Sequence, residues 1–188
     1  MNQVTSKLYI ENVEKSFALS KALFPNEKWM PTETNIWIAE SRLSQEQREP
    51  EKWKKEMSQV KILTSRGSVA VFLPELEIKG KTGSKSADLV LEGEIVEMKT
   101  ITGGRSTLGG KFKIGYKQGA ILVKNCSFTK SHSVYIRLFS DLTVGSVKAQ
   151  IAGVLKNRHD EGKFICFFEK TGELHTWTYD ELRAIIGS

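Results

Sequence analysis

Residues 86–100, S-A-D-L-V-L-E-G-E-I-V-E-M-K-T, form the stretch that decides the fold we expect. Strand-forming residues stand on both sides of Glu92-Gly93, and glycine in the second position of a two-residue turn is typical of a β-hairpin. A turn of this length fixes the register of the two strands, and it places Asp88 directly opposite Glu97. The sequence therefore predicts two carboxylates facing each other on neighbouring strands.

The alternation of side chains gives this hairpin one apolar face and one charged face. The expected core face carries Ala87, Leu89, Val96 and Met98. The other face carries Asp88, Glu97 and Lys99, beside Val90 and Ile95. Opposed carboxylates repel each other, and a shared proton, a cationic side chain or a bound divalent metal relieves the repulsion. Two hypotheses stay open from the pattern alone: a phosphoryl-transfer site, or a solvent-facing hairpin whose charges never converge.

Length and composition indicate a globular chain. Its 188 residues are 39% hydrophobic and 27% charged, which is enough for one domain with a real core. We expect residues 1–48 to form an N-terminal helical appendage and residues 49–188 to form the main domain. No apolar run is long enough to span a membrane, and the first residues lack the order of a signal peptide. We therefore expect action in the cytoplasm, either as a cytoplasmic protein or as a module cut from a larger delivered protein.

The distribution of charge points to a polyanionic partner. The formal net charge is +6 and the sequence pI is about 9.2. Between Met98 and Ser140 the chain has no Asp or Glu. The positive residues of that stretch are Lys99, Arg105, Lys111, Lys113, Lys117, Lys124, Lys130 and Arg137. A field of one sign suits nucleic acid, although a solvated basic face is the plain alternative.

Two features of this basic stretch carry further expectations. Residues 101–111 contain two Gly-Gly pairs and Arg105, and we predict a mobile basic loop there. It lacks the ending of a P-loop. Phe112 and Tyr116 are the aromatic candidates for stacking on bases.

The remaining pattern indicates an α+β fold with a mixed central sheet flanked by helices. Helices are expected over 51–64, 116–125, 144–157 and 180–186, and strands over 69–73, 133–139, 164–168 and 174–177. Thr143 is a candidate N-cap, and Thr178 with Glu181 has the spacing of a capping box.

Asp88 followed by Glu97-Met98-Lys99, in this order of elements, resembles the PD-(D/E)XK nuclease superfamily over roughly residues 50–140. The resemblance implies a restriction-endonuclease-like core in which Asp88 and Glu97 bind a divalent metal, usually Mg²⁺. It implies that Lys99 orients or activates the attacking water. It nominates Gln118 or Lys117 on the following helix as an assisting residue, and Glu56 on the first helix as a further acidic one. Ala87 departs from the proline of the family motif.

The stretch around F-L-P-E (residues 72–75) and the hairpin also resembles, more loosely, C-terminal nuclease domains of bacterial polymorphic and contact-dependent growth inhibition toxins. Many of those domains cut transfer RNA, and such toxins are neutralised by an immunity protein. Some use a metal-free ribonuclease fold of the barnase, colicin and RelE group instead. His132, His159 and His175 keep that alternative open.

The leading hypothesis is therefore a metal-dependent endonuclease that favours RNA over DNA. Asp88 and Glu97 would hold Mg²⁺, while Lys99 and Gln118 would complete the catalytic set. The residues expected to bind the nucleic-acid backbone are Arg105, Lys111, Lys113 and Lys117. A metal-independent ribonuclease, a DNA endonuclease and a non-catalytic nucleic-acid-binding module are the alternatives.

Overall fold

The computed structural model describes residues 3–75, 87–124 and 126–187. It confirms the predicted class, because helices pack against strands in mixed parallel and antiparallel pairings. The chain divides into two compact units, an N-terminal unit over Met1–Ile95 and a C-terminal unit over Val96–Ser188. Each unit is described by itself. The predicted division into residues 1–48 and 49–188 stays a prediction.

Strands of the N-terminal unit pair in the order in which they occur along the chain. Its helical elements are α1 (Gln3–Leu23), a 3-10 turn (Glu40–Arg42), α2 (Gln45–Arg48) and α3 (Pro50–Thr64). Its strands are β1 (Trp29–Glu33), β2 (Ile36–Ala39), β3 (Ala70–Phe72) and β4 (Leu89–Leu91). β1 and β2 are antiparallel, β2 and β3 are parallel, and β3 and β4 are antiparallel. The predicted strand over 69–73 and helix over 51–64 are both present.

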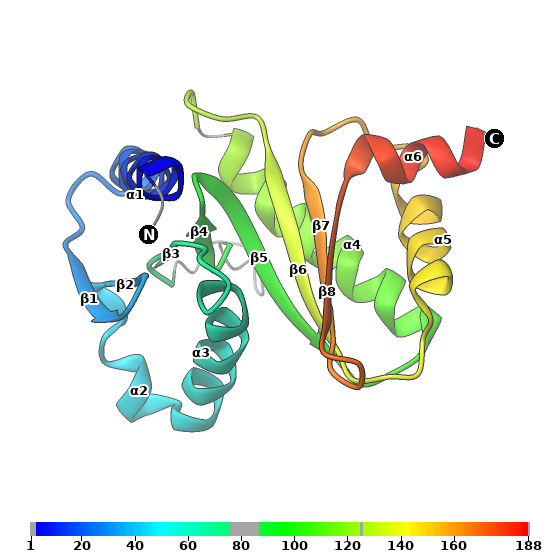
Figure 1. Cartoon of the computed structure of the whole chain (residues 1–188), viewed down its shortest axis with the longest axis horizontal. Coiled ribbons are helices and arrows are strands. Elements are labelled where there is room, and N and C mark those ends of the chain that lie inside the picture. The colour runs from blue at the N-terminus through cyan, green and yellow to red at the C-terminus, as the bar shows by residue number, and fades with distance from the viewer. Residues whose placement is uncertain (1–2, 76–86, 125, 188) are drawn as a thin grey trace, which may run out of the picture. The chain divides into compact units, whose positions relative to one another are not determined.

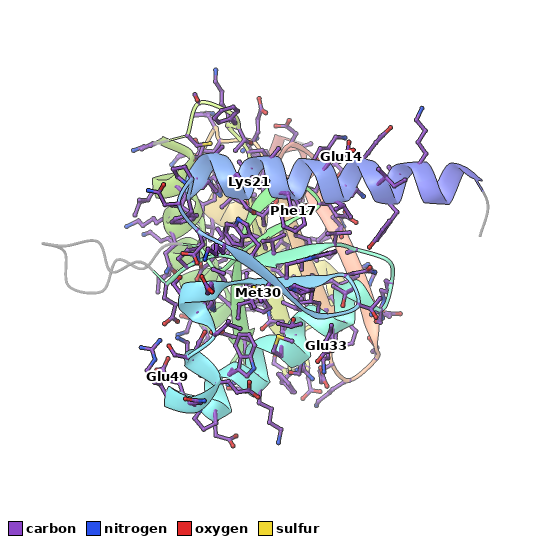
Figure 2. All side chains as sticks on the ribbon, turned by 90° about the vertical axis from the view of Figure 1, so that its left-hand side faces the viewer. Glu14, Phe17, Lys21, Met30, Glu33 and Glu49 are labelled. Atoms are coloured by element: carbon purple, nitrogen blue, oxygen red, sulfur yellow. The ribbon has the colours of Figure 1, made fainter. Side chains whose placement is uncertain are left out.

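Aromatic contacts fix α1 and α3 on these strands. Phe17 of α1 lies edge-on to Trp37 of β2, with ring centroids 5.2 Å apart, and Figure 2 shows Phe17 on the side of the helix that faces the strands. Trp53 of α3 packs on Phe72 of β3, with centroids 5.4 Å apart. Trp37 pairs with Val71, the neighbour of Phe72. Because consecutive residues point to opposite faces, the two helices cover opposite faces of the strands.

A tight turn follows β4, as the sequence predicts. Glu92 and Gly93 both have positive φ, 51° and 81°, which is the conformation of the type I′ hairpin turn. The amide of Gly93 donates to Ser16 Oγ on α1 at 3.0 Å, and a Cβ on Gly93 would lie 2.9 Å from Lys15 Cβ. The turn therefore docks against α1 at a position where only glycine fits. Residues 79–85, which are rich in Gly, Ser and Lys and for which we expect a loop, lie outside the described residues.

Strands of the C-terminal unit are ordered β5-β6-β7-β8. Its elements are β5 (Glu94–Ile101, which begins in the N-terminal unit), α4 (Arg105–Lys124), β6 (His132–Leu138), α5 (Val144–Leu155), β7 (Lys163–Phe168), β8 (Glu173–Thr178) and α6 (Tyr179–Gly187). β6 and β7 are parallel, and β7 and β8 are antiparallel. Both predicted caps form: Thr143 Oγ1 accepts from the Ser146 amide at 3.2 Å, and Thr178 exchanges hydrogen bonds with Glu181.

The three helices α4, α5 and α6 are seen beside these strands in Figure 1. One apolar core joins them to the strands. Its buried members are Ile101, Leu108, Phe112, Tyr116, Val134, Ile136, Leu138, Val147, Ile151, Leu155, Phe164, Cys166, Phe168, Tyr179 and Leu182. Phe112 lies at its centre, with its ring centroid 5.5 Å from Phe164 and 6.0 Å from Tyr179.

Helix α4 begins much earlier than the sequence predicts. The expected mobile loop over 101–111 is wrong from Arg105 onward, where the helix starts. Leu108, Phe112 and Tyr116 recur every fourth residue and are all buried, so one face of the helix enters the core. Each helical glycine costs about 1 kcal/mol relative to alanine, and this burial outweighs that cost, because tertiary packing supplies most helical stability.

Candidate active site

The acidic and basic residues of the E-x-K triplet lie together on β5. Residues two apart on a strand share a face, and the Lys99 ammonium contacts Glu97 Oε1. Glu97 is 1% exposed. Glutamate is almost never fully buried unless it is paired. The expectation of a solvent-facing hairpin is therefore wrong for Glu97, which is an internal carboxylate with a lysine beside it.

Helix α4 makes room for this buried carboxylate. Gly115 stands in the middle of the helix, where a Cβ would lie 3.2 Å from Glu97 Cγ and 3.2 Å from Val134 Cγ1. These separations are shorter than an ordinary van der Waals contact. The absence of a side chain at Gly115 therefore lets the helix backbone approach the Glu97 side chain.

Asp88 lies in the N-terminal unit, directly before β4, and is half-buried. Its backbone carbonyl accepts two hydrogen bonds, from the Leu73 amide at 3.0 Å and from Arg42 Nη1 at 3.0 Å. The Asp88 charge also acts on Glu56 of α3, since it adds to the shift in that carboxyl's pKa. The structure thus brings together Asp88 and Glu56, the more weakly nominated acidic residue.

Glu56 itself is surrounded by donors from the same unit. Its Oε2 accepts from Arg42 Nη2 at 2.7 Å and from Gln45 Nε2 at 3.3 Å, and its Oε1 lies 3.9 Å from Lys52 Nζ. Burial raises the pKa of the Glu56 carboxyl, Arg42 opposes that shift, and Asp88 reinforces it. Sequence reasoning missed Arg42. The only signal was an arginine in a mostly apolar segment, I-W-I-A-E-S-R-L over residues 36–43.

The other part of the predicted metal site is the facing of Asp88 and Glu97, which stays a prediction. Within the residues that the structure describes, no group of three His, Cys, Asp or Glu side chains converges to hold a metal ion. Sites for Mg²⁺ in phosphoryl transfer use one or two carboxylates together with water and substrate oxygens, so a donor set of two carboxylates fits that ion.

The predicted nucleic-acid contacts all lie on α4. Arg105, Lys111, Lys113 and Lys117 are exposed. Spacings of four and seven residues put Lys113, Lys117 and Lys124 along one side of the helix, while Arg105 Nη2 donates to Ser146 Oγ at 2.7 Å. Gln118 is half-buried on the same helix.

Arg137 is a different case among the basic residues. It donates through Nε and Nη2 to the Glu169 carboxylate at 2.7 and 2.9 Å. This bidentate pair balances its charge, so Arg137 adds little to the basic field.

The aromatic candidates for base stacking need a correction. Phe112 and Tyr116 are 0% and 5% exposed, because both point into the core, and neither presents a ring face to a ligand. Phe128 is 74% exposed, and it stands between Lys124 and Lys130 in the chain. An exposed aromatic residue flanked by lysines suits single-stranded nucleic acid.

The three histidines occupy different environments. His132 is fully buried, with Nε2 3.3 Å from Asp160 Oδ2. His175 Nε2 lies 3.3 Å from Glu173 Oε2, and His159 is exposed. Burial lowers the pKa of His132, against the opposing effect of Asp160. An imidazole that is 0% exposed is not accessible to a substrate.

No protein-family model matches the chain, and it matches no curated protein and no solved structure. Among the described residues, no helix is long and apolar enough to cross a membrane.

Proposed function

We propose that the protein is a metal-dependent nuclease that hydrolyses phosphodiester bonds, with RNA favoured over DNA. The observation that supports this most is the Glu97–Lys99 pair: a carboxylate 1% exposed, contacted by an ammonium group two residues along the same strand. Burying a charge costs free energy, and pairing offsets that cost only in part. Buried, paired ionisable groups are enriched at functional sites, so the pair supports a catalytic role for Glu97.

Each residue of the proposed site has a defined part. Asp88 and Glu97 supply carboxylate oxygens, the ligands that Mg²⁺ prefers. When bound, Mg²⁺ would polarise the scissile phosphate and lower the pKa of a bound water. Lys99 places a positive charge where negative charge develops on the phosphate oxygens during attack. Gln118 would assist from α4, as in the family that the hairpin resembles.

Substrate binding is assigned to the exposed basic residues of α4. Arg105, Lys111, Lys113 and Lys117 would hold the phosphate backbone, with an affinity that falls as salt rises. The preference for RNA, including transfer RNA, comes only from the resemblance to toxin domains. An immunity protein and action in the cytoplasm after delivery are proposed on the same ground.

One experiment separates the candidate activities. The purified protein is incubated with total transfer RNA and with plasmid DNA, each with Mg²⁺ and with EDTA. Cleavage that needs Mg²⁺ supports the proposal. Cleavage that persists in EDTA supports the metal-independent ribonuclease, and binding without cleavage supports the non-catalytic module.

Variants of the three named residues test the assignment. We expect Asp88→Asn, Glu97→Gln and Lys99→Ala each to lower cleavage at least about 100-fold, a typical loss when a stabilising group is removed. Affinity for the nucleic acid should stay within about threefold, because the phosphate contacts dominate binding. Glu94→Gln, on the same strand, is the matched control. Full activity in all three variants would refute the assignment.

A further inference from the structure

A buried arginine that the sequence did not single out organises the surroundings of Asp88. Arg42 is 2% exposed and ends the 3-10 turn between β2 and α2. Its guanidinium makes four hydrogen bonds: Nε to Gln45 Oε1 at 2.7 Å, Nη1 to the carbonyls of Leu73 and Asp88 at 2.9 and 3.0 Å, and Nη2 to Glu56 Oε2 at 2.7 Å. A guanidinium holds five N–H donors in one rigid planar fork, whereas an ammonium has three rotatable donors on a flexible stem.

Two of these bonds fix the backbone from which the Asp88 side chain projects. Leu73 follows β3 and Asp88 precedes β4, and the Leu73 amide also donates to the Asp88 carbonyl. Arg42 therefore clamps the paired ends of two strands at the residue that carries the proposed ligand. Small displacements of a reacting group lower rates steeply, so this clamp bears directly on activity.

Glu56, the acidic partner of Arg42, has a cationic or amide donor near each of its carboxylate oxygens. Arg42 and Gln45 bind Oε2, and Lys52 lies 3.9 Å from Oε1. A metal ion at Oε2 would have to displace Arg42 and Gln45, and one at Oε1 would stand beside the Lys52 ammonium, whose charge repels it. Glu56 is therefore placed as the counter-ion of Arg42.

Stability alone does not account for this arrangement. Replacing a buried ion pair by well-packed apolar residues is often neutral or stabilising. The Arg42 guanidinium donates a hydrogen bond to the Asp88 carbonyl and so holds the backbone at that residue, which an apolar side chain could not do.

We propose that Arg42 is a positioning residue for Asp88, and that Glu56 serves as its counter-ion and not as a metal ligand. This inference deepens the proposed nuclease function and rests on it. It assigns different roles to Asp88, which the resemblance makes a metal ligand, and to Glu56, which the resemblance nominates as a further acidic residue of the site.

The first test is Arg42→Lys, which keeps the charge but loses the fork, compared with Arg48→Lys at an exposed arginine on α2. Cleavage is measured against Mg²⁺ concentration. We expect Arg42→Lys to need at least tenfold more Mg²⁺ for half-maximal rate, with unchanged affinity for the nucleic acid in EDTA. A purely structural role would lower the melting temperature without moving the Mg²⁺ midpoint, and that result would overturn the inference.

The second test, Glu56→Gln, does not depend on whether Arg42→Lys folds. Gln keeps an oxygen for Arg42 but removes the negative charge that a metal would need. We expect a Mg²⁺ midpoint within threefold of wild type. A loss of cleavage as complete as that of Asp88→Asn, in a folded Glu56→Gln protein, would show that Glu56 is a ligand and overturn the inference. A wild-type protein that never cleaves would refute the proposed function itself, which is a distinct result.

Discussion

Replacing Gly115 by alanine tests whether α4 leaves room for the Glu97 carboxylate. The added Cβ would lie 3.2 Å from Glu97 Cγ and 3.2 Å from Val134 Cγ1, so neighbouring atoms must yield by a few tenths of an ångström. Alanine gains roughly 0.5–1 kcal/mol over glycine inside a helix, while overpacking a tight site costs about 1–3 kcal/mol. We expect a net loss of unfolding free energy between about zero and 2.5 kcal/mol.

Gly110→Ala is the matched control on the same helix, because it is exposed and no atom lies within 4 Å of the added Cβ. We expect it to gain about 0.5–1 kcal/mol, which raises the melting temperature by a few degrees at most. Both variants are measured by urea and thermal unfolding.

The same comparison has a catalytic readout. A 1 Å misplacement of a catalytic group can cost about 100-fold in rate. If the logarithm of the rate falls in proportion to the displacement, a shift of about 0.3 Å at Glu97 predicts roughly a fourfold loss of kcat. Gly110→Ala should cleave as wild type does. If Gly115→Ala proves as stabilising as Gly110→Ala and cleaves at the wild-type rate, the side chain of Glu97 has space to spare and this account of α4 is refuted.

Two further predictions concern the C-terminal unit. Burial holds the pKa of His132 below its ordinary value, so its stabilising contribution is complete above about pH 6.5 and is lost as the pH falls through the lowered pKa. The free energy of unfolding of the wild-type protein, measured with urea, should therefore fall as the pH is lowered from 7.5 to 5. It should fall less in His132→Asn, and an equal fall in both proteins would contradict this prediction. Phe128→Ala should weaken binding of single-stranded RNA by about 1–3 kcal/mol without affecting binding of duplex, as measured by fluorescence anisotropy with Phe139→Ala as control. Equal loss on both ligands would rule out stacking on an unpaired base.

Local patterns predicted much of the fold. Three local features were found at the predicted residues: the turn at Glu92-Gly93, the helix cap at Thr143 and the capping box at Thr178. The start of α4 was mispredicted because glycines favour a loop when only the local sequence is considered. Leu108, Phe112 and Tyr116 are buried in the core, and this tertiary packing, which a local pattern does not report, favours the helix.

Part of the candidate site was likewise predictable from local sequence, and part of it was not. Glu97 and Lys99 are two residues apart on a strand, so their shared face follows from the sequence. Arg42 stands 46 residues before Asp88, and a contact over that separation depends on how β2, β3 and β4 pair. No short motif records it. The burial of Glu97 was equally hidden, since the alternating pattern left open whether that face meets solvent and does not report that α4 approaches it.

Two locally unfavourable features occur at Glu97, a glycine in the facing helix and a buried carboxylate, and together they support the proposed function. A glycine in the middle of a helix costs about 1 kcal/mol relative to alanine, and a fully buried carboxylate is costly even when paired. A leucine on the strand facing an alanine on the helix would remove both costs and still fill the space. Proteins tend to break such local rules at sites held for function. Gly115 leaves room for Glu97, and Lys99 contacts its carboxylate; this combination is expected if the carboxylate is needed for chemistry and unexplained if β5 is only part of a scaffold.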